Sequence, residues 1–160
     1  MKKKNINWIL VIGWMVLIYI FSSQPGEVSN ENNKFIIYIF NLLSLDLNSI
    51  FGTLSNFIVR KAAHFIIYFI LYILLYRAIN VKRNADIKGF ILPILIVFLY
   101  ACSDELHQAF VPGRGPALRD VLVDTSGGLT AFLIMYICVT FKKKGVDKDV
   151  REITNNKIIT

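Results

Sequence analysis

The side chains that could do chemistry in this chain are concentrated in one block, residues 103–124, with the sequence SDELHQAFVPGRGPALRDVLVD. This block combines acids, bases and hydrogen-bonding groups: Asp104, Glu105, His107, Gln108, Arg114, Arg119, Asp120 and Asp124. It lies between two segments that are apolar enough to cross a bilayer. Because charge in or near hydrocarbon costs several kcal/mol, so many ionisable groups beside membrane spans indicate a functional site at a membrane surface.

Two kinds of chemistry fit these residue types. A histidine beside a carboxylate is a common general acid–base pair, so the candidate catalytic residues are His64, His107, Glu105 and Asp104. Guanidinium groups bind phosphate or carboxylate in a bidentate manner, and carboxylates orient them or take a ligand amine. The candidate ligand-binding residues are therefore Arg60, Lys61, Gln108, Arg114, Arg119, Asp120 and Asp124.

A metal site is a weaker alternative for the same block. Two histidines with Glu105, Asp120 and Asp124 could supply nitrogen and oxygen ligands. The H-E-x-x-H and H-x-x-E-H motifs are absent, however, and the nearby arginines would oppose a cation. We expect neither a metal nor another cofactor.

The elements that must position this block are membrane helices. The chain is 55% hydrophobic with a mean hydropathy of +0.54, which predicts an all-α, polytopic membrane bundle of about four transmembrane helices plus one amphipathic, interfacial helix. The predicted spans are residues 8–21, 57–79, 89–110 and 121–141. Pro93 is expected in the first turn of the third span, where proline is tolerated.

The first span has an alternative, because three lysines before a short apolar run also describe a signal peptide. No A-x-A-like cleavage site follows, and Trp8, Trp14 and Tyr19 suit an anchored helix with aromatic ends. We therefore favour a retained helix.

The segments between and after the spans are more polar. Residues 22–34 are predicted to break the helix at Pro25-Gly26, and residues 35–51 to form the amphipathic helix, with an irregular apolar loop as the alternative. Residues 142–160 form a mixed-charge tail that we expect to be cytoplasmic and mobile.

The net charge of +7 lies mainly in short clusters at segment ends, at residues 2–4, 82–88 and 142–144. Four spans place all three clusters on one side, which the positive-inside rule makes cytoplasmic. Both termini are then cytoplasmic, and the polar block is extracytoplasmic in a multi-pass protein of the cell membrane. Such clusters differ from the basic stripe of a nucleic-acid-binding face, so we expect no nucleic-acid partner.

Helical spacing predicts that the polar groups converge at the outer ends of the spans. Residues three or four apart share a helix face, which aligns Asp104 with His107 and Gln108, and Asp120 with Asp124. It also aligns Arg60, His64 and Tyr68, with Lys61 beside them. The small residues Gly127 and Gly128 permit close helix packing below Asp124.

The loop after the third span and the two cysteines complete the prediction. Pro112-Gly113 and Gly115-Pro116 flank Arg114 in a stiff loop, which could hold its guanidinium over the pocket. Cys102 and Cys138 fall near opposite membrane surfaces, too far apart for a disulfide, and we expect both to be buried and inert.

Four sequence blocks together resemble the VanZ-like family of bacterial membrane proteins. They are FSSQPGEVS at 21–29, RKAAHFIIYFIL at 60–71, SDELHQAFVPGR at 103–114 and RDVLVDTSGG at 119–128. The resemblance implies a VanZ-like transmembrane domain over residues 1–141 and a setting in the bacterial cell envelope. The founding member of that family lowers susceptibility to the lipid-bearing glycopeptide teicoplanin, so the resemblance also implies a role in antibiotic resistance.

Three interpretations of the polar residues stay open. They could form a purely structural ion-pair network that fixes helix register. They could bind or modulate a membrane lipid, a lipid-linked envelope precursor or a lipoglycopeptide. They could also hydrolyse or transfer a group on such a lipid, with arginines stabilising the developing charge. The oligomeric state and the identity of the ligand do not follow from the sequence.

Overall fold

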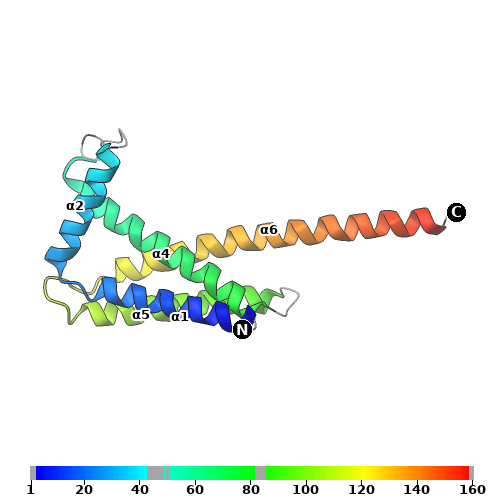
Figure 1. Cartoon of the computed structure of the whole chain (residues 1–160), viewed down its shortest axis with the longest axis horizontal. Helices are drawn as coiled ribbons and strands as arrows, with labels where there is room; N and C mark the ends of the chain where they lie inside the picture. The colour runs from blue at the N-terminus through cyan, green and yellow to red at the C-terminus, as the bar shows by residue number, and fades with distance from the viewer. Residues whose placement is uncertain (1–2, 43–48, 50, 82–85, 159–160) are drawn as a thin grey trace.

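The computed structural model describes residues 3–42, 49, 51–81 and 86–158. Throughout this part of the chain the regular elements are helices, as predicted. Figure 1 shows α1, α4, α5 and the first part of α6 lying alongside one another, while α2 projects from one end. The elements are α1 (Lys3–Ser22), α2 (Gly26–Leu42), the short 3-10 helix η1 (Gly52–Leu54), α4 (Ser55–Ile79), α5 (Ile87–Gln108) and α6 (Leu118–Ile158).

Among the residues that the structure describes, four stretches are long and apolar enough to cross a membrane: Asn5–Ser22, Gly52–Ile79, Ile87–Gln108 and Leu118–Lys142. Large hydrophobic side chains remain exposed on the outside of these helices, among them Ile12, Leu99 and Ile137. Such a surface is expected where lipid, rather than water, surrounds the bundle. The chain is therefore a multi-pass membrane protein, as its composition predicted.

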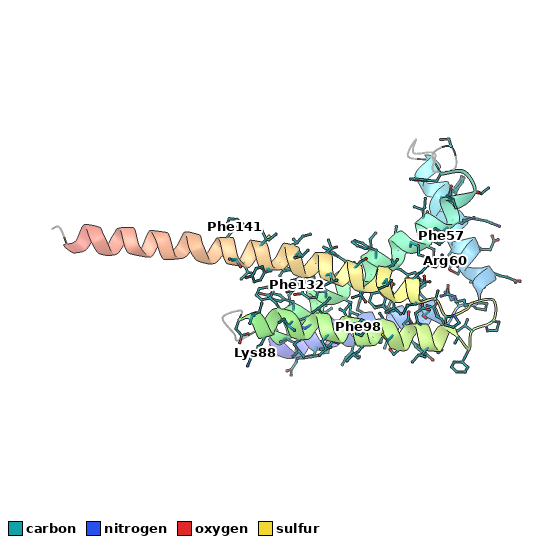
Figure 2. All side chains as sticks on the ribbon, turned by 180° about the vertical axis from the view of Figure 1, so that it is seen from behind. Phe57, Arg60, Lys88, Phe98, Phe132 and Phe141 are labelled. Carbon is teal, nitrogen blue, oxygen red and sulfur yellow. The ribbon has the colours of Figure 1, made fainter. Side chains whose placement is uncertain are left out.

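The ends of the four spans alternate between two sides of the bundle. Asn7 near the start of α1 donates a hydrogen bond from Nδ2 to the carbonyl oxygen of Arg77 near the end of α4, at 3.0 Å. Figure 2 places Lys88 and Phe141 toward that same side, and Phe57 and Arg60 toward the other. The ends of α1 and α5 and the beginnings of α4 and α6 thus lie together.

Helix α4 is the centre of the bundle and packs against α1, α2, α5 and, most extensively, α6. Its Tyr68, Leu71 and Tyr72 are fully buried. Two aromatic side chains donate hydrogen bonds from their polar tips to backbone carbonyls of a neighbouring helix: Tyr72 Oη donates to Phe90 O at 3.2 Å and Trp14 Nε1 to Ile67 O at 2.9 Å. Because hydrocarbon offers no other partner, such contacts satisfy the polar tip and join two helices at once.

Helix α6 comes into close backbone contact with α4 at Gly127. A Cβ at this position would lie 2.2 Å from the carbonyl oxygen of Phe65, so only glycine fits. At the next residue, Gly128, a Cβ would lie 2.7 Å from Val97 Cγ1 of α5. The predicted close packing at this glycine pair is confirmed.

Helix α5 begins earlier than predicted, at Ile87, and this changes the place of Pro93. Asp86 caps the helix by accepting a hydrogen bond at Oδ1 from Gly89 N at 2.9 Å. Pro93 therefore lies inside the helix rather than in its first turn, and it cannot donate to the carbonyl of Gly89. Asn80 Nδ2 donates to that oxygen instead, at 2.9 Å, so the carbonyl is satisfied from outside the helix.

Two predictions about the connecting segments were wrong in detail, and a third is only partly covered by the described residues. Helix α2 begins directly after Pro25, so the expected break at residues 22–34 is confined to a short turn. Part of the predicted amphipathic helix, residues 43–48 and 50, lies outside the described residues. Helix α6 does not stop at Lys142: it continues away from the bundle to Ile158 (Figure 1), so the tail is helical where we expected a mobile segment.

The cysteines are both free, as expected. Cys102 is half-buried, whereas Cys138 is exposed on the surface of α6. The prediction that both thiols are buried was therefore wrong for Cys138, because helix packing leaves that face of α6 uncovered.

Candidate functional site

Helices α4 and α6 are joined at their polar ends by two pairs of charged or ionisable side chains. Lys61 Nζ pairs with Asp120 Oδ1, and one turn deeper His64 Nδ1 lies 3.0 Å from Asp124 Oδ1. The side chain of Asp124 is fully buried. The spacing of three residues on α4 and four on α6 puts both pairs on the facing sides of the two helices, and the predicted alignment of Asp120 with Asp124 is confirmed.

Helix α5 adds two buried carboxylates and an amide to the same end of the bundle. Gln108 Nε2 donates to Asp104 Oδ2 at 3.3 Å and to Ser22 Oγ of α1 at 3.0 Å. Glu105 Oε2 accepts from the backbone N–H of Ala117 at 2.8 Å and so holds the segment that leads into α6. The predicted alignment of Asp104 with Gln108 is confirmed.

His107 does not join these carboxylates. Its Nε2 lies 3.0 Å from Ser23 Oγ, and its ring packs on Tyr19 with 4.7 Å between ring centroids. Ser23 Oγ also donates to the carbonyl oxygen of Tyr19 at 2.7 Å. Of the two histidines proposed for acid–base chemistry, only His64 is paired with a carboxylate in the structure.

A cavity of about 480 Å³ opens between the polar ends of α1, α2, α4 and α5. Its polar groups include the guanidiniums of Arg60 and Arg114, the His64 imidazole and the buried Asp104, and its apolar wall comes from α1 and α4. The lining residues are Ile18, Phe21, Ser22, Gln24, Ser29, Asn32, Arg60, Ala63, His64, Ile67, Asp104 and Arg114.

Two guanidiniums face one cavity, and the carboxylates of Asp104, Glu105 and Asp120 lie near enough to act on the charge of Arg114. Burial lowers the pKa of Arg114, and the nearby charge of Arg60 lowers it further, while Asp104 acts in the opposite direction. Arg114 Nη2 donates to the carbonyl oxygen of Phe21 at 3.3 Å, and this hydrogen bond holds the guanidinium group at the end of α1. An anion in the cavity would relieve the repulsion between the two cations.

The wall formed by α2 was missed at the sequence level. The N–H of Gly26 donates to Pro112 O at 3.1 Å, and a Cβ at Gly26 would lie 2.3 Å from the carbonyl oxygen of Gly113. Gly113 itself has a φ of 72°, in the left-handed region that favours glycine. The backbones of the QPG turn (residues 24–26) and the VPG turn (residues 111–113) are therefore in direct contact. This contact brings Gln24, Ser29 and Asn32 to the cavity.

A signal for this wall was present in the sequence. The FSSQPGEVS block contributed to the family resemblance but was interpreted only as a turn. Conversely, Arg119 is exposed and does not line the cavity, although we had included it among the ligand-binding candidates. Lys61 and Asp120 pair with each other beside the cavity rather than in its wall.

Within the described residues, no group of three or more His, Cys, Asp or Glu side chains is placed to hold a metal ion. The groups that could hold a ligand are therefore those of the cavity: two guanidiniums, one imidazole, one carboxylate and several neutral hydrogen-bonding side chains.

The fold and this site define a multi-span helical membrane protein with a cavity of apolar and charged side chains at one end of its bundle. A sequence model of the VanZ/LLP1 family matches residues 7–139, and the chain belongs to that family. The match includes α1 and most of the membrane part of α6, and so exceeds the region over which we had noted the resemblance. Searches of curated proteins and of solved structures each found no match.

Proposed function

We propose that the cavity binds the anionic headgroup of a membrane lipid or of a lipid-linked envelope precursor. The observation that carries this proposal is the pair of guanidiniums, Arg60 and Arg114, in one cavity with an apolar wall. Arginine forks fit the oxygens of phosphate or carboxylate, and the wall of Ile18, Phe21 and Ile67 offers apolar contact to the first carbons of an acyl or prenyl chain.

The neutral polar side chains support a headgroup with further hydrogen-bonding groups. Asn32 Nδ2 donates to Gln24 Oε1 at 2.9 Å, which orients both amides at the wall formed by α2. Ser29 and Ser22 add hydroxyls. A headgroup that carries hydroxyls or amides beside its phosphate, such as a glycerol or a sugar, would complement these donors and acceptors.

Replacement of either arginine is expected to weaken lipid binding. Arg60→Gln and Arg114→Gln each remove a charge-assisted hydrogen-bonding fork, worth about 1.5–3 kcal/mol, which is about tenfold or more in affinity. The measurement is native mass spectrometry of the purified protein with phosphatidylglycerol and with a polyprenyl diphosphate. Arg119→Gln is the matched control, because it removes the same charge next to the site without touching the cavity wall. Equal retention of lipid by all three variants would contradict the proposal.

We further propose that the cavity faces the outside of the cell and that both termini are cytoplasmic, following the positive-inside rule. A membrane-impermeant maleimide added to intact cells is then expected to label Gly115→Cys but not Lys88→Cys, in a chain whose own cysteines are replaced. Both positions are exposed and lie at opposite sides of the bundle. Labelling of Lys88→Cys alone would reverse the orientation and place the cavity at the cytoplasmic face.

In this proposal the VanZ/LLP1 protein lowers susceptibility to teicoplanin-type glycopeptides by capturing either the lipid-linked precursor or the lipid tail of the antibiotic. Both ligands combine an anionic or polar head with an apolar chain. The guanidiniums of the cavity complement such a head, and its apolar wall complements such a chain. The Arg60→Gln and Arg114→Gln variants are accordingly expected to lose any gain in teicoplanin tolerance that expression of the chain produces, whereas Arg119→Gln is expected to keep it.

A further inference from the structure

The pair of His64 and Asp124 differs from the other pair that joins α4 to α6. Lys61 and Asp120 already connect the two helices one turn closer to their ends, and Gly127 sets their separation below. Register between α4 and α6 therefore has other determinants. Only His64 of these side chains lies in the cavity wall.

The contact with Asp124 determines which ring nitrogen of His64 is left for a ligand. Nδ1 lies 3.0 Å from Asp124 Oδ1, and a carboxylate accepts, so Nδ1 carries the proton that is donated. Nε2 is then the unprotonated nitrogen of the neutral imidazole. A buried carboxylate that fixes the tautomer of a histidine beside a ligand cavity is the arrangement found around a general base.

The remaining groups of the cavity suit a phosphorus centre. Arg60 and Arg114 line the same cavity as His64, so a phosphate held by the guanidiniums would share that space with the His64 imidazole. Preorganised cations at a phosphoryl group stabilise the charge that develops on its oxygens during transfer.

From this arrangement we infer that the protein hydrolyses a P–O bond in the headgroup of the lipid bound in the cavity, with His64 as general base. This inference rests on the proposed binding function. His64 Nε2 takes a proton from water while the water oxygen bonds to phosphorus. The P–O bond to the leaving group breaks, and its electron pair stays on the leaving oxygen. The imidazolium then returns the proton to that oxygen, giving a phosphate and an alcohol, or two phosphates if the bond is an anhydride. Asp124 is a positioning residue in this scheme.

The test uses the purified full chain in phosphatidylcholine vesicles that contain phosphatidylglycerol or a polyprenyl diphosphate, whichever the wild type retains. The reaction is run in oxygen-18 water, and the products are identified by mass spectrometry. Wild type is expected to release product with oxygen-18 in the new phosphate over many turnovers. His64→Asn keeps an N–H donor near the position of Nδ1 but has no equivalent of Nε2, so it is expected to retain lipid and to lose turnover by about 100-fold or more.

Two further variants keep the test decisive. In His64→Ala, added imidazole is expected to restore part of the turnover, a result that a purely structural histidine would not give. Glu31→Gln, on the exposed side of α2, is the control for handling of the vesicles and is expected to match wild type.

The outcomes separate the two proposals. Lipid retained by the wild type without any product overturns hydrolysis and leaves binding in place, whereas neither retention nor product overturns both. Product that persists in His64→Asn, or that depends on His107 instead, overturns the assignment of His64.

Discussion

Gly127→Ala is expected to lower the free energy of unfolding by about 3 kcal/mol, because overpacking at a site that cannot relax is among the most costly single changes. The added methyl would lie 2.2 Å from the carbonyl oxygen of Phe65. The obstacle is backbone of α4, which cannot move aside as a side chain could. The two helices would have to separate, and their separation would disturb the pairing of His64 with Asp124 one turn away.

The control for this prediction is Gly13→Ala in α1, where a Cβ would have nothing within 4 Å. Alanine favours the helix over glycine by about 1 kcal/mol, so this variant is expected to be neutral or slightly stabilised. The measurement is reversible unfolding in mixed detergent micelles, followed by tryptophan fluorescence. If both glycine variants unfold at the same detergent composition as wild type, α4 and α6 are not in backbone contact at Gly127.

Asp124→Ala is expected to destabilise the chain by about 1 to 3 kcal/mol, the cost of leaving a buried hydrogen-bond donor without its partner. The side chain of Asp124 is fully buried, and the deletion leaves His64 Nδ1 without its acceptor in the interior. Asp124→Asn keeps an oxygen that can accept this hydrogen bond, so its loss of stability is expected to be smaller than that of Asp124→Ala.

The comparison for Asp124 is the exposed pair of Lys34 and Glu31 on α2, whose side chains are 61% and 70% exposed. Glu31→Ala breaks this pair but is expected to cost less than about 1 kcal/mol, because water solvates the remaining charge. Unfolding of all three variants under the same conditions tests the difference. If Asp124→Ala and Glu31→Ala cause similarly small losses of stability, water reaches the first turns of α6. The pair of His64 and Asp124 is then not buried in the membrane protein.

Much of the site could be predicted from helical spacing. Residues three or four apart placed Asp120 with Asp124 on one helix face, and His64 with the neighbouring Lys61 at the polar end of another helix. The pairing of Lys61 with Asp120 and of His64 with Asp124 is known only from the structure. Gly127 was identifiable as a packing residue because small side chains inside a span have few other uses. The role of Arg114 at the cavity followed from its stiff loop.

The two histidines show where spacing was insufficient. His107 is one turn from Asp104 along the sequence, yet its ring contacts Tyr19 of α1 and Ser23 directly after α1. Spacing assigns a residue to a sector of the helix surface, but it does not say which neighbouring helix covers that sector. The side chain of His107 therefore falls outside the cavity, although its position on the helix is close to that of residues inside it.

The sequence by itself determined that this is an all-helical, multi-span membrane protein of the VanZ/LLP1 family, because hydropathy and the order of the motifs depend only on the chain. It also determined which polar residues need partners, since burial of charge is costly whatever the fold. Only the tertiary structure decided which partners they have. The backbone contact of Gly26 with Gly113 makes α2 a wall of the cavity, and the packing of α1 against α5 turns His107 away from it. Both outcomes depend on how helices distant in sequence meet, and no local pattern encodes that.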